Sequence, residues 1–397
     1  MSSLRTPSAD AGRLLRLAGE DPGAARKAFS TLPLDAQVAL VCEAPVARRA
    51  DLLALAERPE ALIPALPPAE LCFTAKAVGL ADAGWVLEHA TEEQIAACVD
   101  LDAWRGLGPD RERFTEWLQA FEDAGEEALL RAARAVDFEV LVLQLRARAA
   151  VHLKPNDDEG WEAPPGAQTL DGQFYLLALR DDDELTDLLT LLRLLFEQDY
   201  WFYFRLVQAG VWELESETEE WALRWRAGRL QDLGFPSWEE AMQVYGHLRP
   251  ERCRELPAQP PGPSLGEWPL PIWMPDLPAA YEGGPSLFRA LASLDAEERR
   301  PCLFAFLAVA NRVAVAERLP LGEADTLPRA IDKVARLASL GLDFLVEEHG
   351  VEPAQVLRRA GLERLFRVGV NLEGDAALPA APRAEPPEPP EPAEGDR

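Results

Sequence analysis

The fold of this chain is decided by a short stretch that opens with prolines and continues as an apolar run, Leu66-Pro67-Pro68-Ala69-Glu70-Leu71. Proline is favoured in the first turn of a helix, where its missing N–H is not needed. The apolar Leu71, Ala75 and Val78 recur at intervals of three and four residues, which is the period of one helix face. We therefore expect a short helix that begins near Pro67 and buries one side.

Similar openings recur before and after this stretch. They are Leu32-Pro33-Leu34-Asp35, Ala44-Pro45, Arg58-Pro59-Glu60 and Thr91 to Gln94, the last with the form of a capping box. Helices this short bury their apolar faces by stacking on neighbours. The openings at Leu32 and Leu66 lie 34 residues apart, which hints at a helix-pair repeat. The sequence predicts a loosely ordered lead over 1–22 and then a solenoid-like superhelix over 23–153.

The rest of the chain changes composition in blocks. In order, we predict an acidic loop (154–168), an aromatic-rich helical region (169–256), a Pro-rich extended segment (257–285), C-terminal helices that pack with 169–256 (286–372) and a disordered acidic Pro-rich tail (373–397). Phe174 to Leu177 fits either a short strand or the start of a helix. The fold class that follows is mainly α.

The charge balance restricts the partners of the protein. The chain has 40 basic and 68 acidic residues, which gives a net charge of −28 at pH 7. Such a surface repels nucleic-acid phosphates and anionic membranes, so we expect no nucleic-acid partner. Five widely spaced cysteines without a Cys-x-x-Cys pair argue against a disulfide framework and a zinc site. With no apolar leader and no apolar run long enough for a membrane span, we expect a cytoplasmic protein.

The motifs of common catalytic centres are missing from the sequence. It has neither of the glycine-rich phosphate loops, no Gly-x-Ser-x-Gly and no His-Glu-x-x-His. The acidic runs Asp157 to Glu159 and Asp181 to Glu184 could attract a divalent cation, but they lack the spacing of an EF-hand loop. Acids at a helix N-terminus are the better interpretation of the second run. We predict no catalytic residue, no metal site and no cofactor.

One stretch and one residue pair stand out as a candidate ligand or partner pocket. The candidate residues are Trp221, Arg224, Trp225, Arg226, Arg229, Asp232, Asn311 and Arg312. In one interpretation, the residues from Trp221 to Phe235 form an aromatic and guanidinium pocket for an anion or acidic peptide. In the other, which we favour, they are a packed aromatic core whose arginines pair with Asp232 or a nearby Glu. The polar pair inside an apolar helix, Asn311-Arg312, likewise favours a structural network, because buried polar groups need partners.

Several stretches together carry a resemblance to a known family. They are Leu66 to Leu71, Val78 to Ala83, Asp100 to Trp104, Thr169 to Gly172, Glu220 to Phe235 and Leu362 to Leu372. In their order the chain resembles an uncharacterised bacterial family of unknown function over residues 15–372, which implies an architecture and no activity. Residues 30–104 also resemble the helical superhelix at the cytoplasmic end of some magnesium transporters and in flagellar motor switch proteins, through short helices opened by Leu-Pro.

Three functions from different classes fit these observations. The first, which we favour, is a non-catalytic scaffold whose stacked helices present a concave face to a protein partner, with the acidic tail as an arm. The second is an enzyme of unfamiliar type with a site near residues 221–235. The third is a sensor of a small ligand or a divalent cation.

Overall fold

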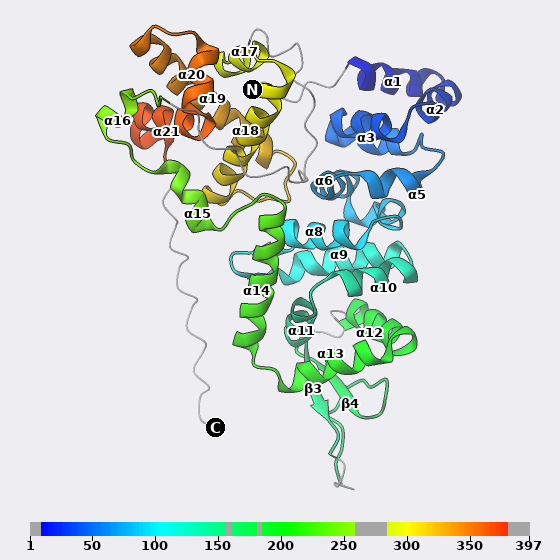
Figure 1. Ribbon diagram of the computed structural model, residues 1–397. Coiled ribbons are helices and arrows are strands. Elements are labelled where there is room, and N and C mark those ends of the chain that lie inside the picture. The colour runs from blue at the N-terminus through cyan, green and yellow to red at the C-terminus, as the bar shows by residue number, and fades with distance from the viewer. Residues whose placement is uncertain (1–8, 156–159, 181–184, 259–283, 380–397) are drawn as a thin grey trace.

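The structure is a computed structural model that describes residues 9–155, 160–180, 185–258 and 284–379. Over these residues the chain is mainly α-helical, as predicted, and its strands form two two-stranded sheets. Figure 1 shows a column of stacked helices that runs from α1 (Ala9–Glu20) to α13 (Tyr200–Trp212), and a bundle that contains α17 (Ser286–Ala292) to α21 (Leu362–Glu373). The long helix α14 (Glu215–Asp232) runs along the side of the column toward the bundle.

The column is built from short helices, which pack on close neighbours in sequence, such as α6 on α8 and α8 on α10. They are α1 (Ala9–Glu20), α2 (Pro22–Ser30), α3 (Leu34–Glu43), α4 (Arg49–Leu53), α5 (Pro59–Leu62), α6 (Pro68–Val78), α7 (Gly84–Leu87), α8 (Glu92–Asp102), α9 (Arg111–Asp123), α10 (Glu126–Ala135) and α11 (Phe138–Arg146), with the 3-10 turns η1 (Val46–Arg48), η2 (Ile63–Ala65) and η3 (Leu80–Asp82). The capping box that begins α8 is present, since Gln94 N donates to Thr91 Oγ1 at 3.2 Å and Thr91 N donates to Gln94 Oε1 at 3.0 Å.

A hairpin and two helices form the lower end of the column. A short pair, β1 (Trp104–Arg105) and β2 (Gly108–Pro109), precedes α9, and the longer pair is β3 (Ala149–Leu153) and β4 (Phe174–Ala178). Phe174 to Leu177 therefore forms a strand. The predicted acidic loop, of which 156–159 lie outside the described residues, connects β3 to β4, so the chain on both sides of it shares one sheet. The helices α12 (Thr186–Gln198) and α13 (Tyr200–Trp212) follow.

The remaining elements are α14, which packs on the column, and the helices that lead to and form the bundle. They are α14 (Glu215–Asp232), α15 (Trp238–Met242), η5 (Gln243–Tyr245), α16 (Pro250–Arg254), α17 (Ser286–Ala292), α18 (Ala296–Ala316), α19 (Thr326–His349), α20 (Pro353–Ala360), α21 (Leu362–Glu373) and η7 (Gly374–Ala377). α15 packs on α18, and η5 packs on α21. Residues 259–283, most of the predicted Pro-rich segment, and 380–397 of the predicted tail lie outside the described residues.

The column and the bundle meet at a partly buried cluster of charges. Lys76 Nζ donates to Asp102 Oδ1 at 2.5 Å, to Glu323 Oε1 at 2.7 Å and to the Gly322 carbonyl at 3.0 Å. Trp117 Nε1 donates to the other Asp102 oxygen at 2.9 Å. Burial lowers the pKa of Lys76, but its hydrogen bonds to Asp102 and Glu323 outweigh that effect, so the pKa is raised. One ammonium group thus joins helices α6 and α8 to the turn before α19.

Replacing Lys76 with methionine tests the contribution of this junction. The variant removes the closest cation of the buried Asp102 and leaves it the more distant Arg113, whose Nε lies 3.6 Å from Oδ2. We expect a loss of about 2 kcal/mol in the free energy of unfolding in urea, typical of a hydrogen bond to a charged group. The pKa of Lys76 is higher in the folded protein than in the unfolded chain. Its contribution to the free energy of unfolding is therefore fully present below the unfolded-state pKa, and it is lost only as the pH rises through the folded-state pKa. The deficit should therefore be constant from about pH 6 to 9. Lys27→Met, on the exposed side of α2, is the control, and an equal loss in both variants would contradict the prediction.

Candidate functional site

The predicted Arg/Trp stretch lies on α14, and its side chains divide between two faces of that helix. α14 packs against α11 and, less extensively, against α8. Ala222 and Leu230 are buried on the side that faces these helices. Trp221 and Trp225 are 46% and 49% exposed. The eight candidate residues therefore do not converge on one pocket.

The inward arginines are engaged by the column. Arg229 Nε and Nη2 donate to the two carboxylate oxygens of Asp100 at 2.6 and 2.8 Å. Its Nη1 and Nη2 donate to the two oxygens of Asp137, both at 2.6 Å. Arg226 Nε donates to the Asp100 carbonyl at 2.9 Å, and its guanidinium lies 4.7 Å from the centre of the Trp104 ring. These contacts hold α14 against α8 and the start of α11.

Burial shifts the pKa values at this contact. It raises the pKa of the Asp100 carboxyl, although the hydrogen bond from Arg229 lowers it in part. It also lowers the pKa of Arg226 to about 10, although the charge of Asp100 opposes the shift. Both shifts arise from desolvation of groups that already have partners within the protein. The contact has the character of a structural ion-pair network.

The outward side of α14 is open to solvent. The rings of Trp221 and Trp225 stack with their centres 5.9 Å apart and their planes at 25°. The Arg224 guanidinium lies 5.2 Å from the centre of the Trp221 ring. Asp232, which we expected to pair with an arginine of this stretch, is exposed. Arg229 pairs with Asp100 and Asp137. Of the candidate residues in this stretch, Trp221, Arg224, Trp225 and Asp232 are exposed, so a partner can reach them.

The Asn311-Arg312 pair lies on α18 in the bundle. Asn311 is 3% exposed, and its Nδ2 donates to the Gly234 carbonyl at 3.1 Å, just after α14. Arg312 Nη1 donates to Glu363 Oε2 on α21 at 2.9 Å. The two side chains thus tie α18 to its neighbours on either side, and they do not join Trp221 and Trp225 in a site.

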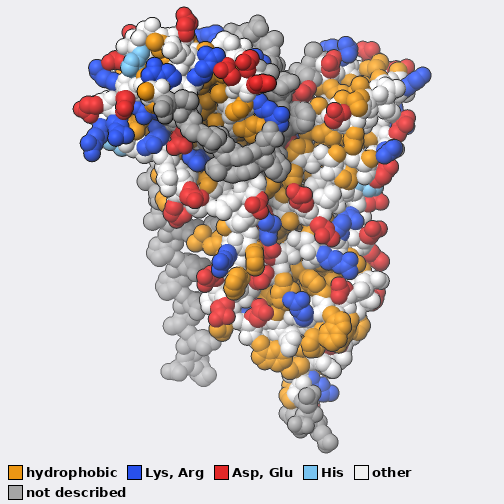
Figure 2. Space-filling model, viewed as in Figure 1, with side chains coloured by type: hydrophobic (Ala, Val, Ile, Leu, Met, Phe, Trp, Pro, Cys, Tyr) orange, Lys and Arg blue, Asp and Glu red, His pale blue; other side chains and the backbone are white. Residues whose placement is uncertain are grey.

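The sequence reasoning did not single out the outer side of α13. Trp201 is 72% exposed and Trp212 is 55% exposed, and eleven residues, or three helical turns, place both on one side of the helix. Tyr200, whose ring contacts Trp201, is 42% exposed, and Leu214, two residues after Trp212 in the sequence, is 62% exposed. We call Tyr200, Trp201, Trp212 and Leu214 the aromatic face. Figure 2 shows hydrophobic side chains gathered over this lower end of the column, where α13 and the β3–β4 hairpin lie.

Packed rings support the aromatic face from beneath. The Trp201 ring contacts Tyr200 and Phe204 at centre distances of 6.0 and 6.1 Å, and Phe204 contacts Phe174 of β4 at 5.7 Å. The signal for this face was present in the sequence, because the five consecutive aromatic residues from Tyr200 to Phe204 point to all sides of a helix. At least one of them must therefore leave the core.

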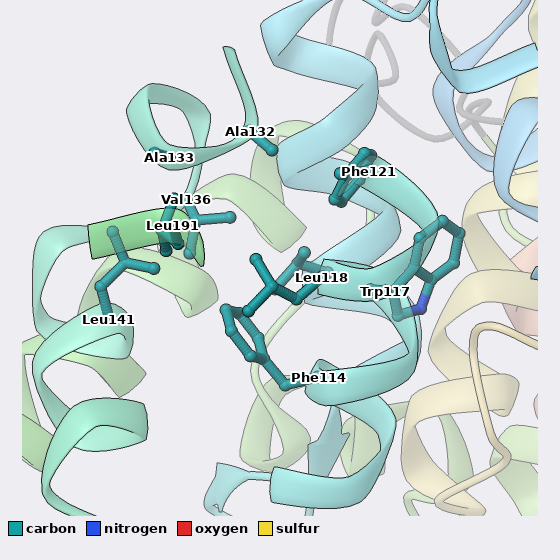
Figure 3. A pocket seen from close by; sticks show the side chains of 10 residues that line it. Phe114, Trp117, Leu118, Phe121, Ala132, Ala133, Val136, Leu141 and Leu191 are labelled. Atoms are coloured by element: carbon teal, nitrogen blue, oxygen red, sulfur yellow. The ribbon is translucent and has the colours of Figure 1, made fainter. Parts of the chain in front are cut away.

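A small apolar cavity lies within the column, between α8, α9, α10, α11 and α12 (Figure 3). Its lining includes Phe114, Trp117, Leu141 and Leu191, and its volume of about 10 Å³ has room for one water molecule at most. Ligand sites in proteins are far larger and include placed polar groups. Within the residues that the structure describes, no group of three or more His, Cys, Asp or Glu side chains is arranged to hold a metal ion. The same part of the chain has no helix that is both long and apolar enough to cross a membrane.

The protein is mainly α and is built of stacked helices. Its candidate site is the exposed aromatic face, because the cavity described above is too small for a ligand. The chain matches the model of a family of unknown function, DUF6178, over residues 26–381, and it belongs to this family. The predicted resemblance to an uncharacterised family is confirmed. A search of curated proteins and a search of solved structures each found no match. The resemblance of residues 30–104 to the transporter and motor-switch superhelix stays a prediction.

Proposed function

We propose that this protein is a non-catalytic interaction scaffold of the bacterial cytoplasm, and that its contact surface for a protein partner is the aromatic face. The observation that carries the proposal is the exposure of Trp201, 72% open to solvent on a helix whose other side is packed. The five cysteines are free thiols in the structure, which suits a reducing compartment.

The energetics of such a surface favour a partner. Burying apolar area stabilises a complex by roughly 25 cal/mol per Å², and one Trp or Tyr side chain can bury about 150–250 Å². Exposed apolar patches of several adjoining large side chains commonly mark interaction sites. Trp and Tyr are also the residues most enriched among those that dominate binding energy. Because the rings of Tyr200, Trp201 and Phe204 already hold one another, little side-chain freedom remains to be lost on binding.

The alternatives, an enzyme or a sensor of a small ligand or a divalent cation near residues 221–235, have less in their favour. Arg226 and Arg229 are engaged with Asp100, and the outward Trp221 and Trp225 are stacked on each other and exposed to solvent. An exposed pair of stacked rings is more useful to a macromolecular partner than to a small molecule, which needs enclosure.

Site-specific photocrosslinking in cells tests the proposal. A benzophenone amino acid at position 201 or 212 is expected to give one discrete high-mass adduct with a partner protein. The matched control is position 107, because Leu107 is a large apolar residue that is 76% exposed on the turn between β1 and β2. The proposal fails if positions 201 and 212 give no adduct, or if they give the same set of adducts as position 107.

A further inference from the structure

We propose that the aromatic face receives a basic amphipathic segment of a partner protein, and that the carboxylates at the corner between α13 and α14 select this segment by charge. This inference rests on the proposed function and adds the chemistry of the partner. It starts from the apolar side chains, since they supply the buried area. The charges then decide which apolar segment is accepted.

The acidic corner adjoins the aromatic face directly along the chain. Between Trp212 and Trp221 the sequence has five glutamates and no lysine or arginine. They are Glu213, Glu215, Glu217, Glu219 and Glu220, and all are exposed. Glu215 and Glu217 lie in the first turn of α14, where the helix dipole favours acids. Glu213, Glu219 and Glu220 lie outside the first turn, so stabilisation of the helix start does not explain their presence.

The nearby arginines contact groups other than the corner carboxylates. Arg146 donates to the backbone carbonyl of Glu213 and not to its carboxylate. The Arg205 guanidinium lies 4.9 Å from the centre of the Phe138 ring, and that of Arg224 lies over Trp221. Within the described residues, the five corner carboxylates make no hydrogen bond or ion pair. Figure 2 shows Asp and Glu side chains at the lower end of α14, beside the hydrophobic side chains.

The spacing of the aromatic face fits a helix of the partner. Eleven residues of α13 separate Trp201 from Trp212, which is roughly 16 Å along the helix axis. A partner helix of three to four turns presents apolar anchors over the same length. Lysines or arginines that flank those anchors would meet the corner carboxylates, and the exposed Trp faces also attract cations.

The same charges argue against other occupants of the face. A second copy of this chain would bring the same acidic corner to the interface, and each chain carries −28 overall. Two chains of the same strong net charge repel one another, which opposes association. An anionic membrane surface is repelled for the same reason. Among occupants that could cover the aromatic face, a basic segment of a protein is the one that the negative charge of the corner attracts.

The test measures binding of labelled peptides to the full-length protein by fluorescence anisotropy. The probe is a helical peptide of about 18 residues, five turns, with leucines on one side and lysines on the other. A peptide with glutamate in place of every lysine, and one with serine in place of every leucine, are the comparison probes. We expect the Leu/Lys peptide alone to bind, with an affinity that falls as salt is raised. Replacing Trp201 and Trp212 together with serine should weaken that binding at least about tenfold, since each removes a large apolar contact.

Charge selection is tested separately. Replacing the five corner glutamates with glutamine is expected to lower the affinity for the Leu/Lys peptide at least about tenfold, a change of about 1.4 kcal/mol in binding free energy. The matched control changes the same number of exposed glutamates elsewhere on the column, Glu57, Glu60, Glu92, Glu93 and Glu127, to glutamine, so the net charge is equal. Equal weakening by both sets would mean that overall charge, and not this corner, attracts the peptide, and the inference would be wrong.

Other results overturn the inference in distinguishable ways. Equal affinity for the Leu/Glu peptide would show that the face does not select by charge. A dimer in sedimentation that the Trp201→Ser change dissociates would identify a second copy as the occupant. Binding to neutral phosphatidylcholine vesicles through Trp201 would identify a lipid surface. If position 201 crosslinks to a protein while the Leu/Lys peptide fails to bind, the proposed function stands and the basic partner does not.

Discussion

Replacing Gly369 with alanine is expected to disrupt the C-terminal bundle. A Cβ atom at this position of α21 would lie 1.9 Å from the backbone oxygen of Leu337 on α19. At Gly341 of α19, the reciprocal position, it would lie 2.1 Å from the backbone oxygen of Leu365. The obstacle is helix backbone, so no side chain can rotate away and the two helices must separate. We expect a loss of at least about 3 kcal/mol in the free energy of unfolding, the upper end of overpacking effects.

Urea unfolding followed by circular dichroism measures this effect, and Gly228→Ala is its matched control. Gly228 lies within helix α14, and an added Cβ there meets no atom within 4 Å. Alanine at such a helix position should raise stability by up to about 1 kcal/mol. The same change of residue should therefore have opposite signs at the two sites. A Gly369→Ala variant as stable as the parent would show that α19 and α21 do not approach as closely as described.

Local signals predicted the elements well. Pro68 at the start of α6 and the capping box at Thr91 are features of a few adjacent residues, and the structure has both. The close contact of α19 and α21 had no such signal. In the sequence, a glycine inside a helix only lowers the expected stability of that helix. That it allows two helix backbones to approach closely can be seen only once the facing helix is known.

The candidate site shows the same limit. The aromatic and arginine residues of α14 were recognised from their spacing, but the acids that hold Arg229 are 129 and 92 residues away in sequence. No pattern in residues 221–235 indicates Asp100 or Asp137, because ion pairs across helices depend on the three-dimensional packing. The exposure of Trp201 was within reach of sequence reasoning, since five adjacent aromatic residues cannot all be buried on one side of α13.

The second large effect is expected when Arg229 is replaced by methionine. Arg229 is the cation that two buried carboxylates share, since the side chains of Asp100 and Asp137 are 3% and 14% exposed. Methionine keeps much of the apolar stem but leaves two negative charges facing each other at the contact of α14 with the column. Breaking a buried pair commonly costs 3–5 kcal/mol, and we expect about 3 kcal/mol here because the Arg229 side chain is itself 33% exposed.

The pH dependence of this loss follows from the pKa of Asp100. Burial raises that pKa and Arg229 counteracts the rise, so removing Arg229 raises it further. An acid whose folded pKa lies above its unfolded value loses stabilisation as pH increases through that interval. The loss in free energy of unfolding of the variant, relative to the parent, should therefore be larger at pH 7 than at pH 5. The difference should shrink as pH falls toward 5, because the carboxyl takes up its proton more readily in the folded variant.

Urea unfolding at pH 5 and pH 7 of the parent, Arg229→Met and the double variant Arg229→Met/Asp100→Asn checks this account. The asparagine removes one of the two charges at nearly the same shape, so the double variant should recover about 1–2 kcal/mol of the loss at pH 7. Arg224→Met, on the exposed side of the same helix, should change stability by less than about 0.5 kcal/mol. If Arg229→Met loses the same free energy at both pH values and Asp100→Asn restores none of it, Arg229 stabilises the contact through packing. The two carboxylates would then not depend on its charge.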